Sequence, residues 1–235
     1  MGKLIALEGL DGAGKRTLVG AVVARLTEQG LTVGTLDFPR YGRSVHADLA
    51  SEALKGAHGD LSDSVHAMAV LFALDRSGAV GELGELLAGH DLVILDRYVA
   101  SNAAYGAARL HQGADGEFVG WVQNLEFERL GLRRPDLQLY LDVPVALAAQ
   151  RARGRESADA SRSLDAYERD RGLQERTGEL YRELAVKDWI SPWWVLTPDT
   201  DPVTLAENLA LLSDDTARRN GERAVTASED ATIGT

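Results

Sequence analysis

The feature that most constrains this chain is a glycine-rich segment near its N-terminus. The apolar run Leu4–Leu7 has the length of a short buried strand, and the segment EGLDGAGKRT, residues 8–17, follows it directly. Apolar residues at helical spacing then run from Leu18 to Leu26 and stop at Gly30. This order of strand, glycines, lysine and helix is typical of a phosphate-binding loop, in which backbone N–H groups and a helix N-terminus surround a polyphosphate. The sequence therefore predicts that residues 8–17 bind a polyphosphate.

The loop departs from the usual pattern at the position after its lysine. Arg16 stands there in place of the Ser or Thr that usually holds Mg²⁺. Thr17 is one residue later, about 100° around a helix, so it does not replace the missing hydroxyl without a rearrangement of the loop. We therefore expect metal ligands from elsewhere, with Asp11 as a candidate. An ordinary glycine-rich turn is the alternative, and the order of the elements disfavours it. The residues expected to surround the polyphosphate are Gly9, Asp11, Gly12, Ala13, Gly14, Lys15, Arg16 and Thr17.

Short apolar runs separated by helical patterns predict the rest of the fold. The strands expected after the first lie around Leu31, Val33 and Leu36, and at Leu92–Leu95, Leu137–Leu141 and Trp193–Leu196. One long helical pattern runs from Val65 to Leu87 and ends before Gly89. Apolar strands that alternate with helices imply a parallel sheet covered on both faces. We expect an α/β fold with a five-stranded parallel sheet flanked by helices, and ligands at the carboxyl ends of its strands.

Length and composition predict the domain organisation. The chain has 235 residues, 45% of them hydrophobic, and no linker wide enough to separate two cores. We expect one domain over residues 1–212. Residues 213–235 contain only Val225 and Ile233 as large aliphatic residues, which bury too little apolar surface to offset the entropy cost of ordering. We expect this tail to be disordered.

Composition also limits the compartment and the partners. The longest apolar stretch, Met68–Leu74, is far shorter than the ~18–20 residues that cross a bilayer. The chain has no cysteine, which fits a reducing compartment, so we expect a cytoplasmic protein with no membrane partner. A net charge of −11 opposes binding to nucleic acid, which needs an extended basic surface. An anionic ligand must then be held by a local basic pocket.

A second set of polar residues follows the strand predicted at 92–95. Asp96 and Arg97 come at its carboxyl end, beside the expected phosphate loop, where Asp96 is placed to hold Mg²⁺ through water. Three- and four-residue spacing then places further polar residues on one helix face. These residues are Ser101, Asn102, Tyr105 and Arg109.

Two aromatic and basic pairs are expected at the same edge. Phe72 and Arg76 are four residues apart and present a ring beside a forked donor, as stacking on a base and reading a carbonyl require. The segment FPRY at 38–41 adds a second cluster. Taken alone, each residue is better explained by core packing or by a solvated helix charge. Their joint placement favours an acceptor pocket, and hence transfer of a phosphoryl group to a second substrate rather than to water.

Arginines gather again in the second half of the chain. Arg151, Arg153, Arg155 and Arg162 flank a polar stretch at 156–161. Side chains two residues apart point about 200° apart on a helix, so these arginines converge on one ligand only where the backbone leaves the helix. The pattern predicts a mobile lid at about residues 151–163. A charge-balanced, solvated helix end without a ligand is the alternative.

Four motifs, in order along the chain, resemble the thymidylate kinase family, in particular its actinobacterial form. They are DGAGK at 11–15, FPRY at 38–41, DRY at 96–98 and SNAAY at 101–105, and the likeness runs from about Leu4 to Leu212. The resemblance implies a P-loop nucleoside monophosphate kinase with a mobile lid. Such an enzyme transfers the γ-phosphoryl group of ATP to dTMP, giving dTDP and ADP, usually as a homodimer with Mg²⁺.

The resemblance also implies roles for individual residues. The glycine-rich loop would hold ATP. The residues implied for dTMP are Phe38, Arg40, Tyr41, Phe72, Arg76, Arg97, Ser101, Asn102, Tyr105 and Tyr167. Phe72 would stack on the base, Arg76 reach its 4-oxygen and Asn102 its N3, while Tyr105 crowds the 2′ position. Arg40, Tyr41 and Arg97 would hold the acceptor phosphate. The implied metal ligands are Asp11, Asp96 and Glu168, and the implied catalytic residues are Lys15, Arg97, Arg16, Arg153 and Asp11. Whether Arg16 or a lid arginine stabilises the transferring group stays open.

Two other functions compete with this one. A deoxynucleoside kinase shares the phosphate loop but needs a carboxylate base for its acceptor hydroxyl, and Glu8 is a candidate. A nucleotide-dependent switch or partition module has no use for a second basic pocket. The basic residues at 38–41 and at Arg97 favour an acceptor that already carries a phosphate.

Overall fold

The computed structural model describes residues 1–158 and 166–213 of the chain. Its centre is a five-stranded sheet in which every pairing is parallel, with the strand order β2-β3-β1-β4-β5. The strands are β1 (Lys3–Glu8), β2 (Val33–Asp37), β3 (Leu92–Asp96), β4 (Leu137–Leu141) and β5 (Trp193–Leu196). The five-stranded parallel α/β fold predicted from the sequence is confirmed.

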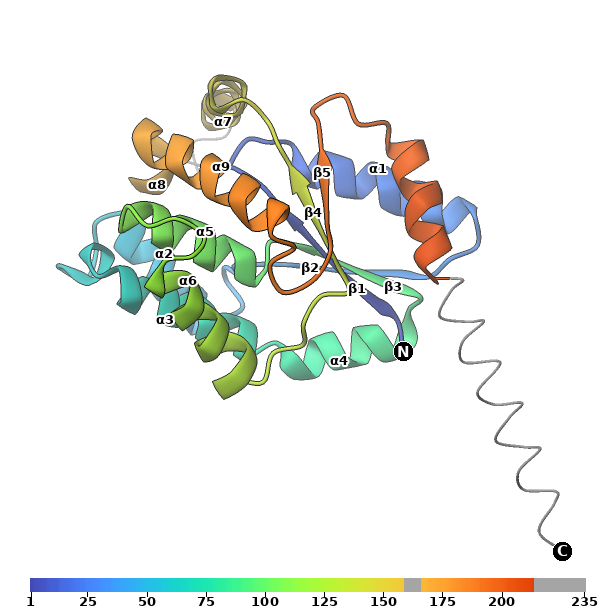
Figure 1. The fold of residues 1–235 in the computed structure, drawn as a ribbon, viewed down its shortest axis with the longest axis horizontal. Coiled ribbons are helices and arrows are strands. Elements are labelled where there is room, and N and C mark those ends of the chain that lie inside the picture. The colour runs from blue at the N-terminus through green and yellow to red at the C-terminus, as the bar shows by residue number, and fades with distance from the viewer. Residues whose placement is uncertain (159–165, 214–235) are drawn as a thin grey trace, which may run out of the picture.

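Helices connect successive strands and cover the sheet. The helices are α1 (Lys15–Glu28), α2 (Val45–Leu54), α3 (Val65–Ser77), α4 (Val80–Gly89), α5 (Val99–Arg109), α6 (Glu117–Gln123), α7 (Val145–Ala158), α8 (Ala166–Arg169) and α9 (Arg171–Val186). A short 3₁₀ turn, η1 (Leu61–Asp63), and a π-helical segment, η2 (Asn124–Arg129), add to them. A last helix covers residues 202–213 and lies beside α1 (Figure 1).

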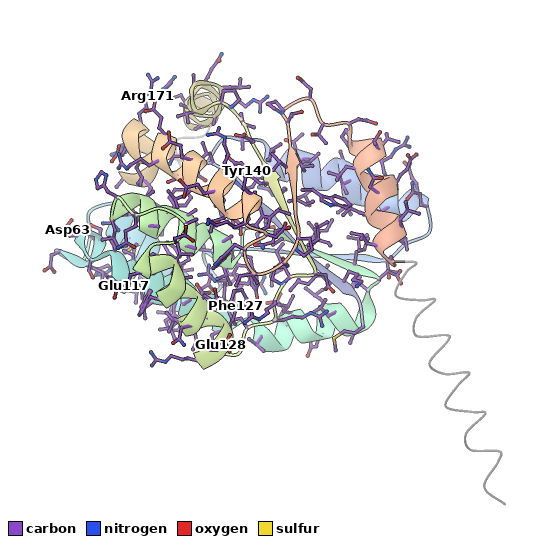
Figure 2. All side chains as sticks on the ribbon, in the orientation of Figure 1. Asp63, Glu117, Phe127, Glu128, Tyr140 and Arg171 are labelled. Carbon is purple, nitrogen blue, oxygen red and sulfur yellow. The ribbon has the colours of Figure 1, made fainter. Side chains whose placement is uncertain are left out.

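The alternation of side chains along β1 divides the core into two layers. Leu4 and Ala6 pack with residues of α3, α4, α5, α6 and α9 on one face of the sheet. Ile5 and Leu7 pack with α1, α7 and the last helix on the other face. Tyr140 of β4, which is labelled in Figure 2, reaches the α9 side. Its ring there stacks on Tyr181 of α9, with ring centroids 5.1 Å apart. Both faces are therefore buried, as near-continuously apolar strands require.

Register places three strand ends at one level. Leu7 of β1 pairs with Asp96 of β3, and Asp37 of β2 pairs with Asp96 from the other side. At their carboxyl ends the neighbouring strands β1 and β3 continue into helices on opposite faces of the sheet, α1 after β1 and α5 after β3. Such a change of face opens a crevice outside the carboxyl ends of parallel strands. The fold therefore brings the phosphate loop and the Asp96–Arg97 segment together.

The prediction of one continuous helix from Val65 to Leu87 is wrong, because the structure has two helices there. The segment is divided into α3 and α4 at Gly78, whose N–H donates to the carbonyl of Leu74, while Ala79 donates to Arg76 in a tighter turn. The apolar pattern continues across this turn because α4 covers the same face of the sheet as α3.

The predicted lid lies only partly within the described residues. Residues 151–158 continue helix α7, so the expectation that the backbone leaves the helix between Arg151 and Arg155 is wrong. Residues 159–165, with Arg162, lie outside the described part of the chain, as does the predicted tail beyond Ser213. Among the helices that the structure describes, none is both long and apolar enough to cross a membrane.

Candidate active site

The segment after β1 forms a tight loop whose backbone conformation requires glycine, as Gly12 and Gly14 show. Gly12 has φ +80°, and a Cβ there would lie 2.1 Å from the carbonyl oxygen of Ala148 in α7. Gly14 has φ +104° and stands immediately before the first turn of α1. Positive φ and close backbone approach both favour glycine. The loop therefore keeps its backbone N–H groups and the start of α1 beside the cleft, as a polyphosphate requires.

Lys15 is folded back onto this loop. Its Nζ donates to the carbonyl oxygens of Gly9 and Leu10, each at 3.2 Å, and lies 3.9 Å from Oδ1 of Asp96. Burial and the positive charge of Arg97 lower the pKa of Lys15 to about 8, against the attraction of Asp96 and other nearby carboxylates. The lysine is thus a buried cation whose present partners are mainly neutral carbonyls, and an anionic phosphate would be a stronger partner.

One large cleft, of about 1010 Å³, joins this loop to the predicted acceptor residues. Its wall includes every predicted polyphosphate residue except Gly9 and Ala13, and every predicted dTMP residue except Arg40. The predicted site residues in the wall are Asp11, Gly12, Gly14, Lys15, Arg16, Thr17, Phe38, Tyr41, Phe72, Arg76, Asp96, Arg97, Ser101, Asn102, Tyr105 and Tyr167. Arg151 and Ala152 of α7 also line it, and Arg151 donates to the carbonyl of Ala13 at 2.9 Å.

Arg97 links the two halves of the cleft. Its backbone adopts φ +69°, in the left-handed region, immediately after β3. Its guanidinium donates to Oδ1 of Asp11 at 2.7 Å and to Ser101 Oγ at 3.0 Å, and lies 5.4 Å from the ring centroid of Tyr105. Tyr105 in turn donates to Oδ2 of Asp11 at 2.9 Å. An arginine held in an uncommon backbone conformation beside an acidic partner is typical of a functional site.

Both carboxylate oxygens of Asp11 therefore already accept a hydrogen bond, one from Arg97 and one from Tyr105. Burial raises the pKa of Asp11, but the charges of Arg97 and Lys15 outweigh burial and hold the pKa at about 2. The carboxylate stays ionised at neutral pH and neutralises Arg97. The prediction that Asp11 binds the metal stays a prediction, because such binding would share oxygens that already accept two hydrogen bonds.

Arg40 differs from the rest of the predicted acceptor set. Its Nε donates to Oδ1 of Asp75 at 2.9 Å, and its Nη2 donates to the carbonyl of the same residue at 2.7 Å. It lines a smaller neighbouring cavity of about 310 Å³ rather than the main cleft. Tyr41, half exposed, lines both. The role of Arg40 at the acceptor phosphate stays a prediction.

The structure also places Arg153 of the predicted lid, and Tyr167, which follows the lid in the sequence. Arg153 is an exposed residue of α7 and is not in the cleft wall. Tyr167 of α8 stacks on Tyr105 with ring centroids 5.9 Å apart, and its hydroxyl accepts from Arg109 at 2.6 Å. Arg109 is thus not a cleft residue but a support for one, contrary to the expectation from its helix face. Glu168 lies in α8, and its side chain is outside the described part of the structure.

Glu8 lies behind the cleft and not in its wall. Its carboxylate is fully buried and accepts from the N–H of Tyr98 at 2.8 Å, from Ser101 at 2.6 Å and from Tyr181 at 3.1 Å. Burial raises the pKa of Glu8, although these donors oppose the shift. A carboxylate with this position and these partners orients Ser101 and is not available to an acceptor hydroxyl, which disfavours the deoxynucleoside kinase alternative.

Sequence reasoning missed three site residues. Tyr181 of α9 forms hydrogen bonds with Arg97, Ser101 and Glu8. It belongs to no short motif that would have predicted this role. Glu126 of η2 binds both Arg76 and Asn102. Asp37 lies at the end of β2 in the cleft wall, where burial and the Asp96 charge raise its pKa against the opposing charge of Arg16. Its position at a strand end, like that of Asp96, was the available signal.

The acidic side chains in the described part of the cleft are the possible ligands of a divalent metal ion. No three acidic or histidine side chains among the described residues form a cluster that would enclose a metal ion. Asp96 Oδ1, however, is buried without a hydrogen-bond donor among those residues, and it faces the loop at the Lys15 end. Mg²⁺ at phosphate-transfer sites commonly takes one or two carboxylates together with waters and substrate phosphates. The residues present fit that kind of site.

A glycine loop that can hold a triphosphate, sharing one cleft with a basic and aromatic acceptor pocket, defines the class of protein as a P-loop nucleoside monophosphate kinase. Comparison with known proteins specifies the family. A protein-family model described as thymidylate kinase matches residues 7–192 of this chain. The chain belongs to the thymidylate kinase family, the ATP-dependent enzymes that phosphorylate dTMP.

Individual relatives agree with the family model. A thymidylate kinase from Mycobacterium tuberculosis strain H37Rv is 58% identical over 207 residues, which cover 88% of this chain and 97% of that protein. A thymidylate kinase from Rhodopseudomonas palustris strain CGA009 is 33% identical over 192 residues, which cover 80% of this chain and 78% of that protein. The actinobacterial resemblance predicted from the motifs is confirmed.

Proposed function

We propose that the cleft between the glycine loop and α5 is where this chain transfers the γ-phosphoryl group of ATP to dTMP, giving ADP and dTDP. One observation carries the assignment. Arg97 and Asp11 join the two binding regions within a single cleft, since Asp11 belongs to the loop and Arg97 to the acceptor side. Donor and acceptor phosphates bound there would meet at these residues, as in-line transfer requires.

The loop forms the donor half of the proposed site. The backbone around Gly12 and Gly14, the N-terminus of α1 and Lys15 would hold the triphosphate of ATP. When the phosphates arrive, Lys15 would exchange the carbonyls of Gly9 and Leu10 for phosphate oxygens. This exchange costs little, because the two present bonds of Lys15 are long, at 3.2 Å each.

The acceptor half takes the monophosphate. Phe72 would stack on the base, Arg76 and Asn102 would bond its edge, and Tyr105 would crowd a 2′-hydroxyl and so favour deoxyribose. Support comes from their common location in the cleft wall. The residues proposed to surround the sugar and phosphate are Phe38, Arg40, Tyr41, Arg97, Ser101, Tyr105 and Tyr167.

Charge neutralisation and alignment carry the proposed chemistry. The acceptor phosphate of dTMP is already an anion, so transfer needs no strong general base, and the loose transition state asks mainly for positive charge around the migrating group. Lys15 and Arg97 would supply it, together with Arg16. We favour Arg16 over Arg153 because Arg16 lines the cleft and Arg153 does not.

Mg²⁺ is part of the proposal. Asp96, whose Oδ1 lacks a hydrogen-bond donor in the described structure, is the ligand that we favour, with Asp11 and Glu168 as further candidates. Bound there with the phosphates of ATP, the ion would neutralise their charge. From the family resemblance we also propose a cytoplasmic homodimer.

A coupled assay of ADP release tests the function. With ATP and Mg²⁺, we expect turnover that depends on dTMP and is absent with thymidine, since thymidine lacks the phosphate that Arg97 would bind. Turnover with thymidine equal to that with dTMP, or turnover without any acceptor, would reject the proposal.

A further inference from the structure

The base-binding wall of the cleft is supported by a buried carboxylate that does not itself line the cleft. Arg76 of α3 and Asn102 of α5 are 4% and 6% exposed and lie in the cleft wall. Behind them is Glu126, fully buried in the π-helical segment η2, whose place in Figure 2 is marked by the labels of Phe127 and Glu128. Three elements far apart in the sequence therefore meet at one carboxylate.

Glu126 binds both residues of the wall. Nε of Arg76 donates to its Oε2 at 2.5 Å, and Nη2 of Arg76 donates to its Oε1 at 2.7 Å. The same Oε1 accepts from Nδ2 of Asn102 at 2.8 Å. The second N–H of that amide donates to the carbonyl of Ala69 at 2.9 Å. Glu126 thus couples the orientation of the guanidinium to that of the amide.

This coupling fixes which atoms the cleft receives. An ionised carboxylate and a backbone carbonyl only accept hydrogen bonds, so the nitrogen of the Asn102 amide must face both of them. Both of its N–H groups are then used, and its oxygen Oδ1 is left for the cleft. On Arg76, Nε and one N–H of Nη2 are used, while Nη1 has no hydrogen-bond partner among the described residues. The wall therefore offers a ligand the remaining N–H groups of Arg76 as donors and Oδ1 of Asn102 as an acceptor, in a fixed order.

That pair matches one type of pyrimidine and not the other. A 4-oxo pyrimidine, such as thymine, presents a carbonyl acceptor at position 4 and an N–H donor at N3. A 4-amino pyrimidine presents an amino donor at position 4 and an acceptor at N3. The second arrangement would set donor against donor and acceptor against acceptor. A site built to pair buried polar groups rejects a ligand that leaves them unpaired.

We infer that Glu126 is a positioning residue that makes the site selective for 4-oxo over 4-amino pyrimidine monophosphates, by holding Arg76 and the Asn102 amide in one orientation. The inference rests on the proposed function, since it takes the Arg76–Asn102 wall as the place where the base binds. Replacing Glu126 by Gln retains the size of the side chain but places an N–H group among donors. The one oxygen of Gln cannot accept all three hydrogen bonds that the carboxylate accepts, so the donors of Arg76 and Asn102 no longer share a common acceptor. The orientations of the guanidinium and of the Asn102 amide are then no longer fixed together.

The test compares dTMP with two other acceptors, 5-methyl-dCMP and dUMP. The first differs from dTMP in the 4-substituent and the second in the 5-methyl group. We expect Glu126→Gln to lower the ratio of kcat/KM for dTMP to kcat/KM for 5-methyl-dCMP at least tenfold, because these two differ only in the 4-substituent and the N3 that pairs with it. The ratio of dTMP to dUMP, which share the 4-oxo edge, should change less than about twofold. Losses for dTMP and 5-methyl-dCMP in the same proportion, with an unchanged ratio, would overturn the inference.

Controls separate this result from a loss of fold and from failure of the proposed function. Glu183→Gln makes the same chemical change at a carboxylate that accepts from the N–H of Ala114, outside the cleft wall, and should leave both ratios unchanged. The ATP dissociation constant reports whether Glu126→Gln is folded. Should that variant not fold, Glu126→Asp is measured instead, since its shorter carboxylate cannot keep all three bonds, and a wild-type ratio there would overturn the inference. Wild-type protein that does not phosphorylate dTMP rejects the function itself.

Discussion

The phosphate loop and the base-binding wall line the same cleft, but the chain builds them in different ways. The loop is made almost entirely of backbone and lies within residues 9–15, where three positive-φ glycines, Gly9, Gly12 and Gly14, fix its shape. The wall is made of side chains from α3 and α5, held by Glu126, which is 50 residues from Arg76. A binding site made of consecutive backbone is visible in a sequence. A site made of side chains is fixed by partners that only the fold brings near.

The difference implies that the two regions respond differently to mutation. Changes in the loop should act through backbone shape and the affinity for ATP. Changes on the acceptor side should act through single charges and hydrogen bonds, and the affinity for ATP should be retained. Four substitutions, at Arg97, Gly12, Lys15 and Tyr105, test this division.

Arg97→Ala should have the largest effect, because Arg97 is the cation shared by both halves. We expect kcat for dTMP phosphorylation to fall on the order of 10³-fold or more, as for arginines that stabilise a transferring phosphoryl group. Steady-state kinetics measure the loss, and the ATP dissociation constant should change less than about threefold. Arg97→Lys, which keeps the charge near Asp11, serves as the control for folding. Activity of Arg97→Ala close to wild type would remove Arg97 from the site.

Gly12→Ala should damage the donor half through its backbone. The added Cβ would lie 2.1 Å from the Ala148 carbonyl and at a positive φ, so the loop and α7 must move apart. We expect a destabilisation of about 1–3 kcal/mol, measured by urea unfolding, and weaker ATP binding. Gly20→Ala is the matched control, since Gly20 lies in α1 and no atom of the described residues lies within 4 Å of the position that its Cβ would take. A Gly12→Ala protein with wild-type stability and ATP affinity would show that the close approach is not required.

The pKa of Lys15 predicts how ATP binding depends on pH. Lys15 in the ligand-free protein has a pKa of about 8, lowered from 10.5, so the lysine loses its proton above pH 8, whereas the phosphate-bound lysine should keep it. The ATP dissociation constant should therefore rise about tenfold between pH 7 and pH 9, measured by calorimetry. The same linkage makes the unliganded fold gain stability as pH rises from about 8 to 10.5, because the unfolded chain binds this proton more tightly. Lys15→Met should remove the pH dependence, and a slope retained in that variant would assign it to another group.

Tyr105→Phe should have the smallest effect of the four substitutions, and the quantity that it tests is selectivity for the sugar. The ring stays in place against Tyr167, and only the hydrogen bond to Asp11 is lost. If ring bulk excludes a 2′-hydroxyl, preference for dTMP over its ribonucleotide should change less than about threefold, measured as a ratio of kcat/KM values. Ready use of the ribonucleotide by this variant would show that the hydroxyl of Tyr105, and not its bulk, excludes ribose.

The sequence predicted the parts of this molecule that depend on local pattern. Apolar runs located all five strands, and the glycine spacing located the phosphate loop, because each depends on neighbours in the chain. The turn at Gly78 was missed since both helices cover one face of the sheet and so keep one apolar pattern. Glu126 and Tyr181 were missed because nothing near them in the sequence distinguishes a buried carboxylate or hydroxyl with partners from an exposed one. Arg40 belongs to the basic and aromatic segment at 38–41 that the sequence predicts to bind the acceptor phosphate, but in the structure its guanidinium binds Asp75.

The decisive measurement is the release of ADP from ATP by the full chain with dTMP or thymidine as the only acceptor. We expect turnover with dTMP that is lost in Arg97→Ala, and no turnover above background with thymidine. Equal turnover with the two acceptors, or turnover with dTMP that does not require Arg97, would contradict this expectation.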